Sequence, residues 1–340
     1  MSTSQFPASV PGTVRIDRSD VGRRVSVRRL EAALDCATGR PVFRDVIGVL
    51  TSWDEYELVV IGRDRTESRI PVDRLVAGKP VPPFPARRGE LPAASPTELQ
   101  RLAAGSWPAL EREQLGDWTL RAAAGFTKRA NSVQALGDPG LPLPEALAAV
   151  RAWYAARALP ALVEVTSPGT DPALAALLDG LEQLTRAHLQ TAPLAPLARP
   201  VPGAELVRLA TAADEGWLAL YHLTAGSPQM LLAARQLLHG GPSVWFAQVP
   251  GEAGGEPLAI GRCVIDGPWA HFSAVEVSPA ARRRGLATAV MSALAARAAE
   301  EGARAGYLQV EADNDGALAL YDRLGFTTSH TYHYVRLPQA

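Results

Sequence analysis

The first quarter of the chain carries short runs of apolar residues that predict strands. Residues 24–28 alternate polar and apolar side chains, which is the pattern of a strand with one buried face. Apolar runs follow at residues 46–50, 58–61 and 69–72, and turn-like polar segments separate them. Several short strands at this spacing predict a small all-β barrel over residues 1–89.

The segment from residue 97 to residue 190 alternates helical and strand patterns. Thr97, followed by Glu98, predicts the start of a helix, because a threonine side chain can accept a hydrogen bond from the first turn. Asp171 and Pro172 predict another helix start, with an N-cap residue before a proline. Strand patterns lie at residues 117–121, 132–136 and 162–165, and a helical pattern lies at residues 144–157. This order is half of an α+β domain.

Residues 204–337 repeat the alternation. A hairpin and the strand after it are predicted at residues 245–249, 258–264 and 271–277. After Gly285, apolar residues recur at every fourth position and form one helical stripe, made of Leu286, Val290, Leu294 and Ala298. A strand at residues 307–310, a second helix and a final strand complete the pattern.

Two proline-rich stretches, residues 80–96 and 193–202, suit neither a helix nor a strand interior, because proline fixes φ and lacks a backbone donor. We expect both to be linkers. They divide the chain into a small barrel over residues 1–89, an α+β segment over residues 90–200, and a second α+β domain over residues 201–340.

Composition and charge narrow the classes of partner. Hydrophobic residues make up 47% and charged residues 20%, as in ordinary globular proteins. The formal net charge is -1, although residues 1–89 hold 15 basic and 11 acidic side chains, a net of +4. That excess is small and lacks the interleaved aromatic residues that grip single strands, so we do not expect nucleic acid as a partner.

The ends and the cysteines predict a cytoplasmic location. Residues 1–11 have neither the basic nor the apolar region of a signal peptide, and no apolar run reaches the roughly 18 residues of a membrane span. Cys36 and Cys263 lie far apart and match no metal-binding or redox spacing. We therefore expect two structural thiols and no membrane partner.

The candidate chemistry begins in the basic loop after the strand at residues 271–277. The loop and helix start read Arg282-Arg283-Arg284-Gly285-Leu286-Ala287. The first N–H groups of a helix have no intrahelical partner and attract anions. Gly285 and Ala287 leave room for a ligand near the backbone, and the arginines add charged donors. This arrangement predicts a pyrophosphate cradle.

A second motif follows the strand at residues 307–310. Asn314 or Asp315 caps a helix whose inner face is formed by Ala317, Leu320, Tyr321 and Leu324. Gly325 is suited to a left-handed helix end, and Phe326 begins the next strand.

Together the two motifs resemble those of the GNAT superfamily of N-acetyltransferases, Arg/Gln-x-x-Gly-x-Gly/Ala and Asn-x-x-Ala-x-x-Leu-Tyr-x-x-x-Gly-Phe, over about 130 residues. The resemblance implies an α+β fold with a mixed central sheet flanked by helices, acetyl-CoA as co-substrate and no metal. Residues 125–133, GFTKRANSV, resemble tandem actinobacterial-type acetyltransferases and indicate a degenerate GNAT-like half without its own cofactor loop. Residues 1–89 resemble SH3-like barrels in strand order.

The resemblance also implies roles for individual residues. Tyr321 matches the family tyrosine that faces the cofactor sulfur and can protonate the leaving thiolate, and the motif favours this role over the alternative of a core tyrosine on the buried face of the helix. Glu276 and His271 are candidates for orienting or deprotonating the amine, with a solvent-facing glutamate and a structural histidine as the alternatives. The implied cofactor-binding residues are Val275, Val277, Arg282, Arg283, Arg284, Gly285, Leu286, Ala287, Thr288, Asn314 and Tyr321.

The sequence thus favours an enzyme that acetylates a primary amine on a small molecule, a peptide or a protein. The alternative is a non-catalytic acyl-CoA sensor whose barrel binds a protein partner, but an intact loop and Tyr321 favour the enzyme. His330 and His333 lie near each other without a cysteine or carboxylate, so we expect no metal. The acceptor, the acyl-chain preference and the oligomeric state, a homodimer included, are left open.

Overall fold

A computed structural model describes residues 14–34, 39–62, 66–81, 91–221, 227–252 and 255–338. The N-terminal residues searched for a signal peptide, Cys36 and most of the first proline-rich stretch lie outside these residues. The chain divides into two compact units. The first comprises residues 1–86 and 299–302, and the second comprises residues 87–298 and 303–340.

The first unit is an antiparallel sheet with the strand order β4-β3-β2-β1-β5. Its strands are β1 (Arg24–Leu34), β2 (Pro41–Trp53), β3 (Glu57–Gly62), β4 (Glu67–Pro71) and β5 (Leu75–Pro80). Its core contains Ile16, Val25, Val27, Leu50, Leu58, Val60 and Ile70. The four predicted strands are present and β5 was not predicted. These elements form a small β unit, and the closer likeness to SH3-like barrels stays a prediction.

The second unit combines helices with one large mixed sheet. Its helices are α1 (Pro96–Ser106), α2 (Leu143–Ala155), α3 (Pro172–Leu178), α4 (Leu194–Leu197), α5 (Glu215–Leu220), α6 (Pro228–His239), α7 (Leu286–Glu300) and α8 (Asp315–Arg323). Its strands are β6 (Glu111–Leu115), β7 (Trp118–Ala122), β8 (Val133–Gln134), β9 (Leu162–Ser167), β10 (Gln183–Pro193), β11 (Arg208–Ala210), β12 (Ser243–Val249), β13 (Ala259–Asp266), β14 (Trp269–Val277), β15 (Ala305–Glu311) and β16 (Thr327–Arg336). This is the mixed α+β architecture that the sequence predicts.

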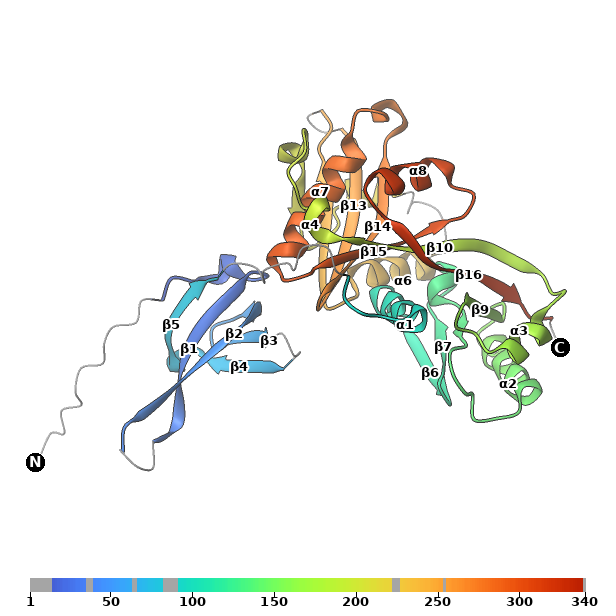
Figure 1. Ribbon diagram of the computed structural model, residues 1–340, viewed down its shortest axis with the longest axis horizontal. Coiled ribbons are helices and arrows are strands. Elements are labelled where there is room, and N and C mark those ends of the chain that lie inside the picture. Colours follow the sequence, from blue (N-terminus) through green and yellow to red (C-terminus); the bar gives the residue numbers. More distant parts are fainter. Residues whose placement is uncertain are drawn as a thin grey trace, which may run out of the picture. The chain divides into compact units, whose positions relative to one another are not determined.

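The sheet contains two similar halves that meet at β10 and β16 (Figure 1). The strand order is β11-β12-β13-β14-β15-β10-β16-β9-β8-β7-β6. In each half an antiparallel hairpin is followed by a parallel pair, β14 with β15 in one half and β8 with β9 in the other. This repetition agrees with a GNAT-like half in the middle of the chain.

The two halves exchange their last strands. The strand β10, from the middle segment, pairs with β15 on one side and with β16 on the other. The C-terminal strand β16 pairs in turn with β9 of the middle segment. Each half therefore completes the sheet of the other, and the sheet runs without a break across the boundary predicted near residue 200.

The second proline-rich stretch is not an exposed linker. β10 continues to Pro193, and Leu194 and Leu197 of the short helix α4 are buried. The Leu194 N–H donates to the carbonyl oxygen of Arg304 at 2.9 Å. The prolines are tolerated because they lie at a strand end and in a single helical turn, where few backbone donors are needed.

Helix α1 begins at a different residue from the one predicted. Its N-cap is Ser95 rather than Thr97, with Pro96 at the first helical position. The Ser95 side chain accepts from the Glu98 N–H, and the Glu98 carboxylate accepts from the Ser95 N–H at 2.7 Å. This reciprocal pair satisfies two backbone donors at the start of the helix. The start of α3 at Asp171 and Pro172 is confirmed.

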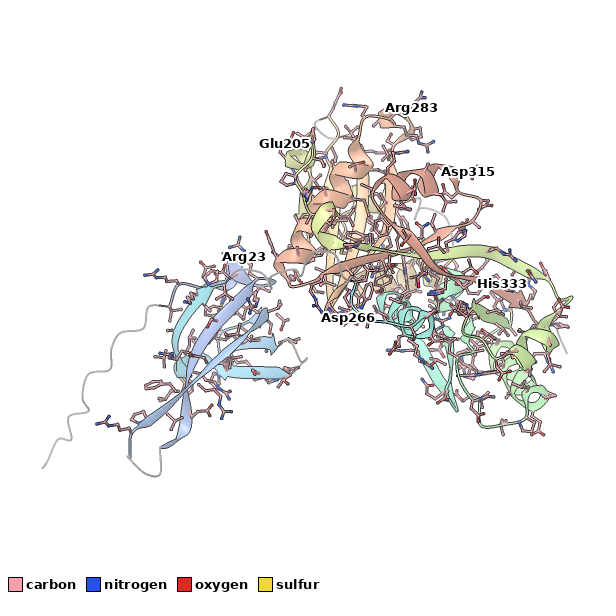
Figure 2. The ribbon with its side chains drawn as sticks, in the orientation of Figure 1. Arg23, Glu205, Asp266, Arg283, Asp315 and His333 are labelled. Atoms are coloured by element: carbon pink, nitrogen blue, oxygen red, sulfur yellow. The ribbon has the colours of Figure 1, made fainter. Side chains whose placement is uncertain are left out.

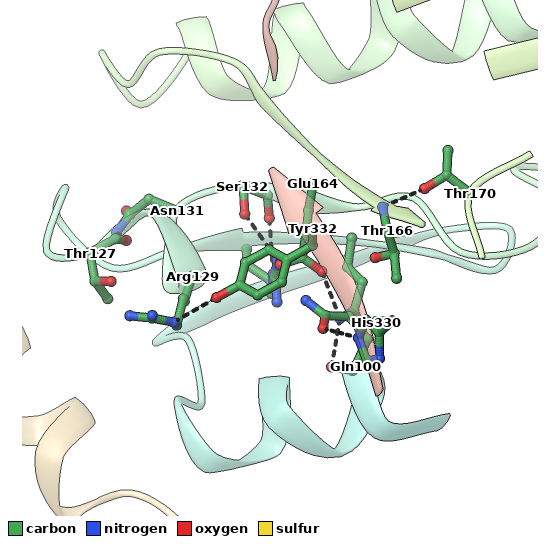
Figure 3. A network of polar contacts seen from close by, with 12 residues as sticks. Gln100, Thr127, Arg129, Asn131, Ser132, Glu164, Thr166, Thr170, His330 and Tyr332 are labelled. Atoms are coloured by element: carbon green, nitrogen blue, oxygen red, sulfur yellow. Dashed lines mark hydrogen bonds and ion pairs between the residues drawn. The ribbon is translucent and has the colours of Figure 1, made fainter. Parts of the chain in front are cut away.

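A buried polar network lies beneath β16 in the middle segment (Figure 3). Arg121 and Glu164 form an ion pair with a 2.9 Å contact, and both side chains are almost inaccessible to water. Gln134 donates to the other oxygen of Glu164 at 3.1 Å. A buried charge must be paired and hydrogen-bonded to be tolerated, and this pair meets both conditions.

We predict that Glu164→Gln lowers the free energy of unfolding by about 3–5 kcal/mol, because the substitution leaves Arg121 charged and buried without its counter-ion. Urea denaturation measures the change. The matched control is Glu215→Gln, which breaks the exposed pair of Glu215 with Arg235 and is expected to change the free energy of unfolding far less, because water screens this pair. Equal losses in the two variants would contradict the prediction.

Candidate functional site

The site begins where β14 and β15 separate. The two strands pair in parallel from Trp269 with Ala305 to Phe272 with Leu308, and the ladder ends there. Beyond this point β14 stays paired with β13, but with a bulge in which Gly261 faces two residues, Ala274 and Val275. Ala274 has a φ of 51°, in the left-handed region. A bulge bends its strand, so residues 273–277 leave β15 and do not continue the parallel ladder with it.

The separation opens a cleft of about 740 Å³. One group of lining residues comes from β14 and the loop after it: His271, Phe272, Ser273, Ala274, Val275, Glu276, Val277, Arg282 and Arg283. A second group comes from α7, β15 and α8: Ala287, Gln309, Val310, Glu311, Asn314, Gly316, Ala317, Leu320 and Tyr321. The remaining lining residues are Trp107, Arg129 and Tyr221.

One end of the cleft is the basic loop between β14 and α7. Arg283 and Gly285 both have left-handed backbones, with φ of 60° and 79°, and the Gly285 carbonyl oxygen accepts the first hydrogen bond of α7, from Ala289. Left-handed residues in such a turn direct successive N–H groups to one side, as in anion-binding nests. Figure 2 shows Arg283 at this end of the β13–β14 pair and Asp266 at the other. The loop therefore offers backbone donors and exposed arginines together.

Helix α8 forms another wall of the cleft. Its N-cap is Asn314, whose side-chain oxygen accepts from the Ala317 N–H at 3.1 Å. Its end follows the predicted left-handed pattern, with Gly325 at a φ of 83° and the Phe326 N–H donating to the Tyr321 carbonyl oxygen. The Tyr321 ring packs edge-on against Phe326, and burial raises the pKa of its hydroxyl to about 12.

His271 lies at the inner end of the cleft, on the face of the sheet opposite α7. Its ring stacks on Tyr307 at 4.8 Å between centroids and meets the edge of Trp107. Its Nδ1 is buried without a hydrogen-bond partner among the described residues. Burial, with smaller contributions from Arg262 and Arg129, holds the pKa of His271 well below its ordinary value. The imidazole is therefore neutral at physiological pH.

Glu276, Tyr221 and Arg129 stand along the same part of the cleft. Burial raises the pKa of Tyr221, Glu276 raises it further, and the positive charges of Arg129 and Arg262 oppose the rise. The Tyr221 hydroxyl is thus within electrostatic range of one carboxylate and two guanidinium groups. Arg129, Tyr221 and Trp107 were not predicted as site residues. Arg129 falls within the quoted segment GFTKRANSV, but nothing local showed that this segment reaches the cleft.

Most of the predicted residues meet at the cleft. It is lined by nine of them, which are His271, Val275, Glu276, Val277, Arg282, Arg283, Ala287, Asn314 and Tyr321. Arg284, Gly285, Leu286 and Thr288 lie in the loop and first turn beside it. Whether each residue has its predicted role stays a prediction.

The two C-terminal histidines do not meet other metal ligands. His330 shares a hydrogen bond of 3.0 Å with the Gln100 side chain, and burial lowers the pKa of His330 to about 4. Across the described residues, no three His, Cys, Asp or Glu side chains are grouped so that they could hold a metal ion. Among those same residues, the helices are too short or too polar for any of them to cross a membrane.

The fold and the paired motifs define a GNAT-type N-acetyltransferase, as the sequence predicts. The chain belongs to the family described as probable histone acetyltransferase Rv0428c C-terminal, which matches residues 95–335 and so spans both halves of the large sheet.

Individual relatives agree with this assignment. The chain is 28% identical over 326 residues to the probable histone acetyltransferase Rv0428c of Mycobacterium tuberculosis, covering 93% of this chain and 95% of the relative. It is 29% identical over 250 residues to the uncharacterized N-acetyltransferase YobR of Bacillus subtilis, covering 70% and 96%. A GCN5-related N-acetyltransferase from Kribbella flavida shares the fold, with a TM-score of 0.53 at 19% identity, covering 73% and 98%.

Proposed function

We propose that the protein transfers an acetyl group from acetyl-CoA to a primary amine by direct attack of the amine on the thioester. The observation that carries the proposal is the cleft between β14 and β15, which has the basic loop at one end and Tyr321 in its wall. Membership of an acetyltransferase family supports acyl transfer as the reaction class. The donor and the acceptor are inferred from the residues of the cleft.

The chain's residues fit acetyl-CoA. The pyrophosphate needs anion donors, which the loop at Arg282–Gly285 supplies, and a Cβ placed on Gly285 would meet nothing within 4 Å, so the loop is open on that side. The pantetheine arm needs amide partners, and residues 273–277 of β14, which line the cleft and do not pair with β15, offer peptide groups for this purpose. On the α8 side of the cleft, the small residues Gly316 and Ala317 leave space for the arm.

When bound, acetyl-CoA supplies the thioester whose carbonyl carbon forms a bond to the amine nitrogen while its bond to sulfur breaks. The Tyr321 hydroxyl would donate a hydrogen bond to the departing sulfur and pass it a proton as the carbon–sulfur bond breaks. Because a phenol is a weaker acid than a thiol, the phenolate then takes up the proton that the attacking amine loses, through water. The raised pKa of Tyr321, about 12, keeps the phenol protonated at physiological pH. Backbone N–H groups of Val275 and Val277 would polarise the carbonyl oxygen.

The amine must lose a proton, and Glu276 is better suited than His271 to help. A general base works best when its pKa lies near the working pH. Burial holds the pKa of His271 well below its ordinary value, so its neutral ring is a weak base. Glu276 lines the cleft beside Tyr221 and is only half-buried. Its carboxylate can therefore orient the amine and help to move the amine proton to water.

One feature of the cleft supports catalysis over a sensor that merely binds acyl-CoA. The binding loop and the phenol belong to one cleft, whereas a sensor would need only the loop. One relative is named a probable histone acetyltransferase, which brings a protein lysine into consideration as the acceptor. A free amino compound is the other class.

We predict that Gly285→Glu abolishes acetyl-CoA binding, because the added carboxylate enters the anion cradle. Isothermal titration with acetyl-CoA should show a loss in affinity of at least about 100-fold. Gly180→Glu is the matched control, since Gly180 also has a left-handed φ, of 76°, with open space around it, but lies just after α3 in the middle segment and outside the basic loop. Tight acetyl-CoA binding by a folded Gly285→Glu protein would place the pyrophosphate elsewhere.

We predict that Tyr321→Phe lowers kcat by roughly 10²–10⁴-fold, the usual contribution of a general acid, while the dissociation constant of acetyl-CoA changes little. Release of free CoA thiol with an active amine measures kcat. Because the pKa of Tyr321 is raised to about 12, ionisation of the phenol should not reduce the wild-type rate below about pH 11.

Tyr154→Phe is the control for loss of a buried hydroxyl. Tyr154 donates to the Arg121 carbonyl oxygen away from the cleft, so its loss should affect stability but not kcat. Equal rates for the wild type and Tyr321→Phe would show that Tyr321 only packs against Phe326 and that water protonates the thiolate.

A further inference from the structure

Arg129 brings a positive charge from the middle segment to the cleft of the C-terminal half. It lies in a single 3-10 turn, Lys128–Ala130, between β7 and β8. Ala130 is fully buried in a cluster with Trp107, Trp217 and Phe246, which joins this loop to the C-terminal half. The positive charge of Arg129 lowers the pKa of both His271 and Tyr221, so it acts at the inner part of the cleft.

The loop that carries Arg129 is held in a fixed shape by Asn131. The Asn131 side-chain oxygen accepts from the N–H groups of Ala123 and Gly125, at 2.8 and 3.0 Å. Its amide nitrogen donates to the carbonyl oxygens of Phe126 and Thr127, at 2.7 and 2.9 Å. These four bonds use the full capacity of one buried side chain to define the loop.

The backbone beside Arg129 is strained. Thr127 has a φ of 55°, which is a genuine outlier for a β-branched residue. Strain of this kind persists only where the surroundings enforce it, and it gathers at functional sites. The chain therefore holds Arg129 in this place at a cost to its own stability.

The guanidinium has one protein partner in the described part of the chain. Its Nε donates to the Tyr332 hydroxyl at 3.2 Å, as Figure 3 shows, and it forms no ion pair with a described carboxylate. The bond to Tyr332 uses the Nε–H group and fixes the orientation of the planar guanidinium. The two terminal nitrogens, Nη1 and Nη2, are left to bind a planar anion.

A second buried arginine nearby shows the contrast. Arg262 likewise pairs with no carboxylate among the described residues, but its donors reach the carbonyl oxygens of Ser106, Leu238 and Gly240, at 2.6–3.0 Å. These oxygens lie at the C-terminal ends of α1 and α6, where the helix dipoles stabilise a cation. Carbonyl oxygens thus satisfy Arg262, whereas the partner of Arg129 within the described part of the chain is a neutral hydroxyl.

We infer that Arg129 binds a carboxylate of the acceptor, so that the acceptor is a small amino acid whose amine lies near its carboxylate. This inference rests on the proposed acetyl transfer. Glu276 and Arg129 are both within electrostatic range of Tyr221, so the cleft presents an acidic and a basic group to one ligand. That pair of charges matches a zwitterion, with the ammonium toward Glu276 and the carboxylate toward Arg129.

The position of Arg129 separates this role from cofactor binding. The pyrophosphate loop follows Val277, and His271 lies six strand residues earlier, about 20 Å away along β14. The charge of Arg129 is felt at His271, at the end away from the loop. A protein lysine, in contrast, carries no carboxylate near its reactive amine and would leave Arg129 unpaired.

The test compares acids with their amides on full-length protein saturated with CoA. The ligands are a complete set of N-acetyl-L-amino acids, which would be the reaction products, and the corresponding C-terminal amides, with binding measured by calorimetry. A hydrogen bond from Arg129 to a charged carboxylate is stronger than one to a neutral amide, so we expect the best acid to bind about 10- to 100-fold more tightly than its amide. O-Phosphoethanolamine, tested alongside, separates a carboxylate site from a phosphate site.

Three variants assign the preference to Arg129. Arg129→Met should lose the preference for the acid while the dissociation constant of CoA is unchanged, and Arg129→Lys, which keeps the charge but not the fork, should retain part of it. Lys128→Met is the matched control, because Lys128 is an exposed cation in the same turn and does not line the cleft. It should bind acids as the wild type does.

The outcomes are distinct. Equal binding of acids and amides by the wild type, an intact preference in Arg129→Met, or a preference for O-phosphoethanolamine would each overturn the inference. If Arg129→Met does not fold, the comparison of wild type with Arg129→Lys decides. Turnover is read separately with acetyl-CoA and the free amino acids. Acid-selective binding without turnover would reject acetyl transfer but keep the carboxylate site, and rapid acetylation of protein lysines in preference to amino acids would reject the site.

Discussion

The candidate site depends on the bulge that stops β14 from following β15. Gly261 faces both Ala274 and Val275, and this extra residue turns the end of β14 away from its parallel neighbour. α7 also packs closely against Gly261, since a Cβ there would lie 2.5 Å from the Val290 side chain. A larger residue would push α7 off the sheet and move the start of α7, where the basic loop ends. One backbone irregularity therefore both separates the end of β14 from β15 and sets the position of the basic loop.

The remaining architecture holds the two sides of this cleft together. β10 comes from the middle segment but pairs with β15 of the C-terminal segment, and the C-terminal strand β16 pairs with β9 of the middle segment. Neither segment therefore has its full set of strands alone. Arg262 adds a buried tie, because one guanidinium bonds the ends of α1 and α6. The middle segment lacks a cofactor loop, and in this arrangement its contribution is to close the cleft with Trp107 and Arg129. A half without a cofactor loop of its own can thus still supply residues to the cleft of the other half.

Local signals in the sequence predict the C-terminal site well. The cap at Asn314, the turn at Gly325 and the stripe of α7 are each set by residues a few positions apart, and the structure confirms them. Pairing between distant strands has no such local signal, which is why the exchange of β10 and β16 was not predicted. β6 was missed for a different reason, since its residues are nearly all exposed and polar. Arg129 was also missed, because it belongs to a short loop with no local motif, and the loop reaches the cleft only by packing against the C-terminal half.

The most direct test of the central claim is a crystal structure of the full chain with acetyl-CoA. The predicted result places the pantetheine arm between the separated ends of β14 and β15, with the pyrophosphate on the N–H groups of residues 283–287 and the sulfur facing the Tyr321 hydroxyl. Density for the cofactor elsewhere, or a structure in which β14 and β15 pair along residues 273–277, would contradict it.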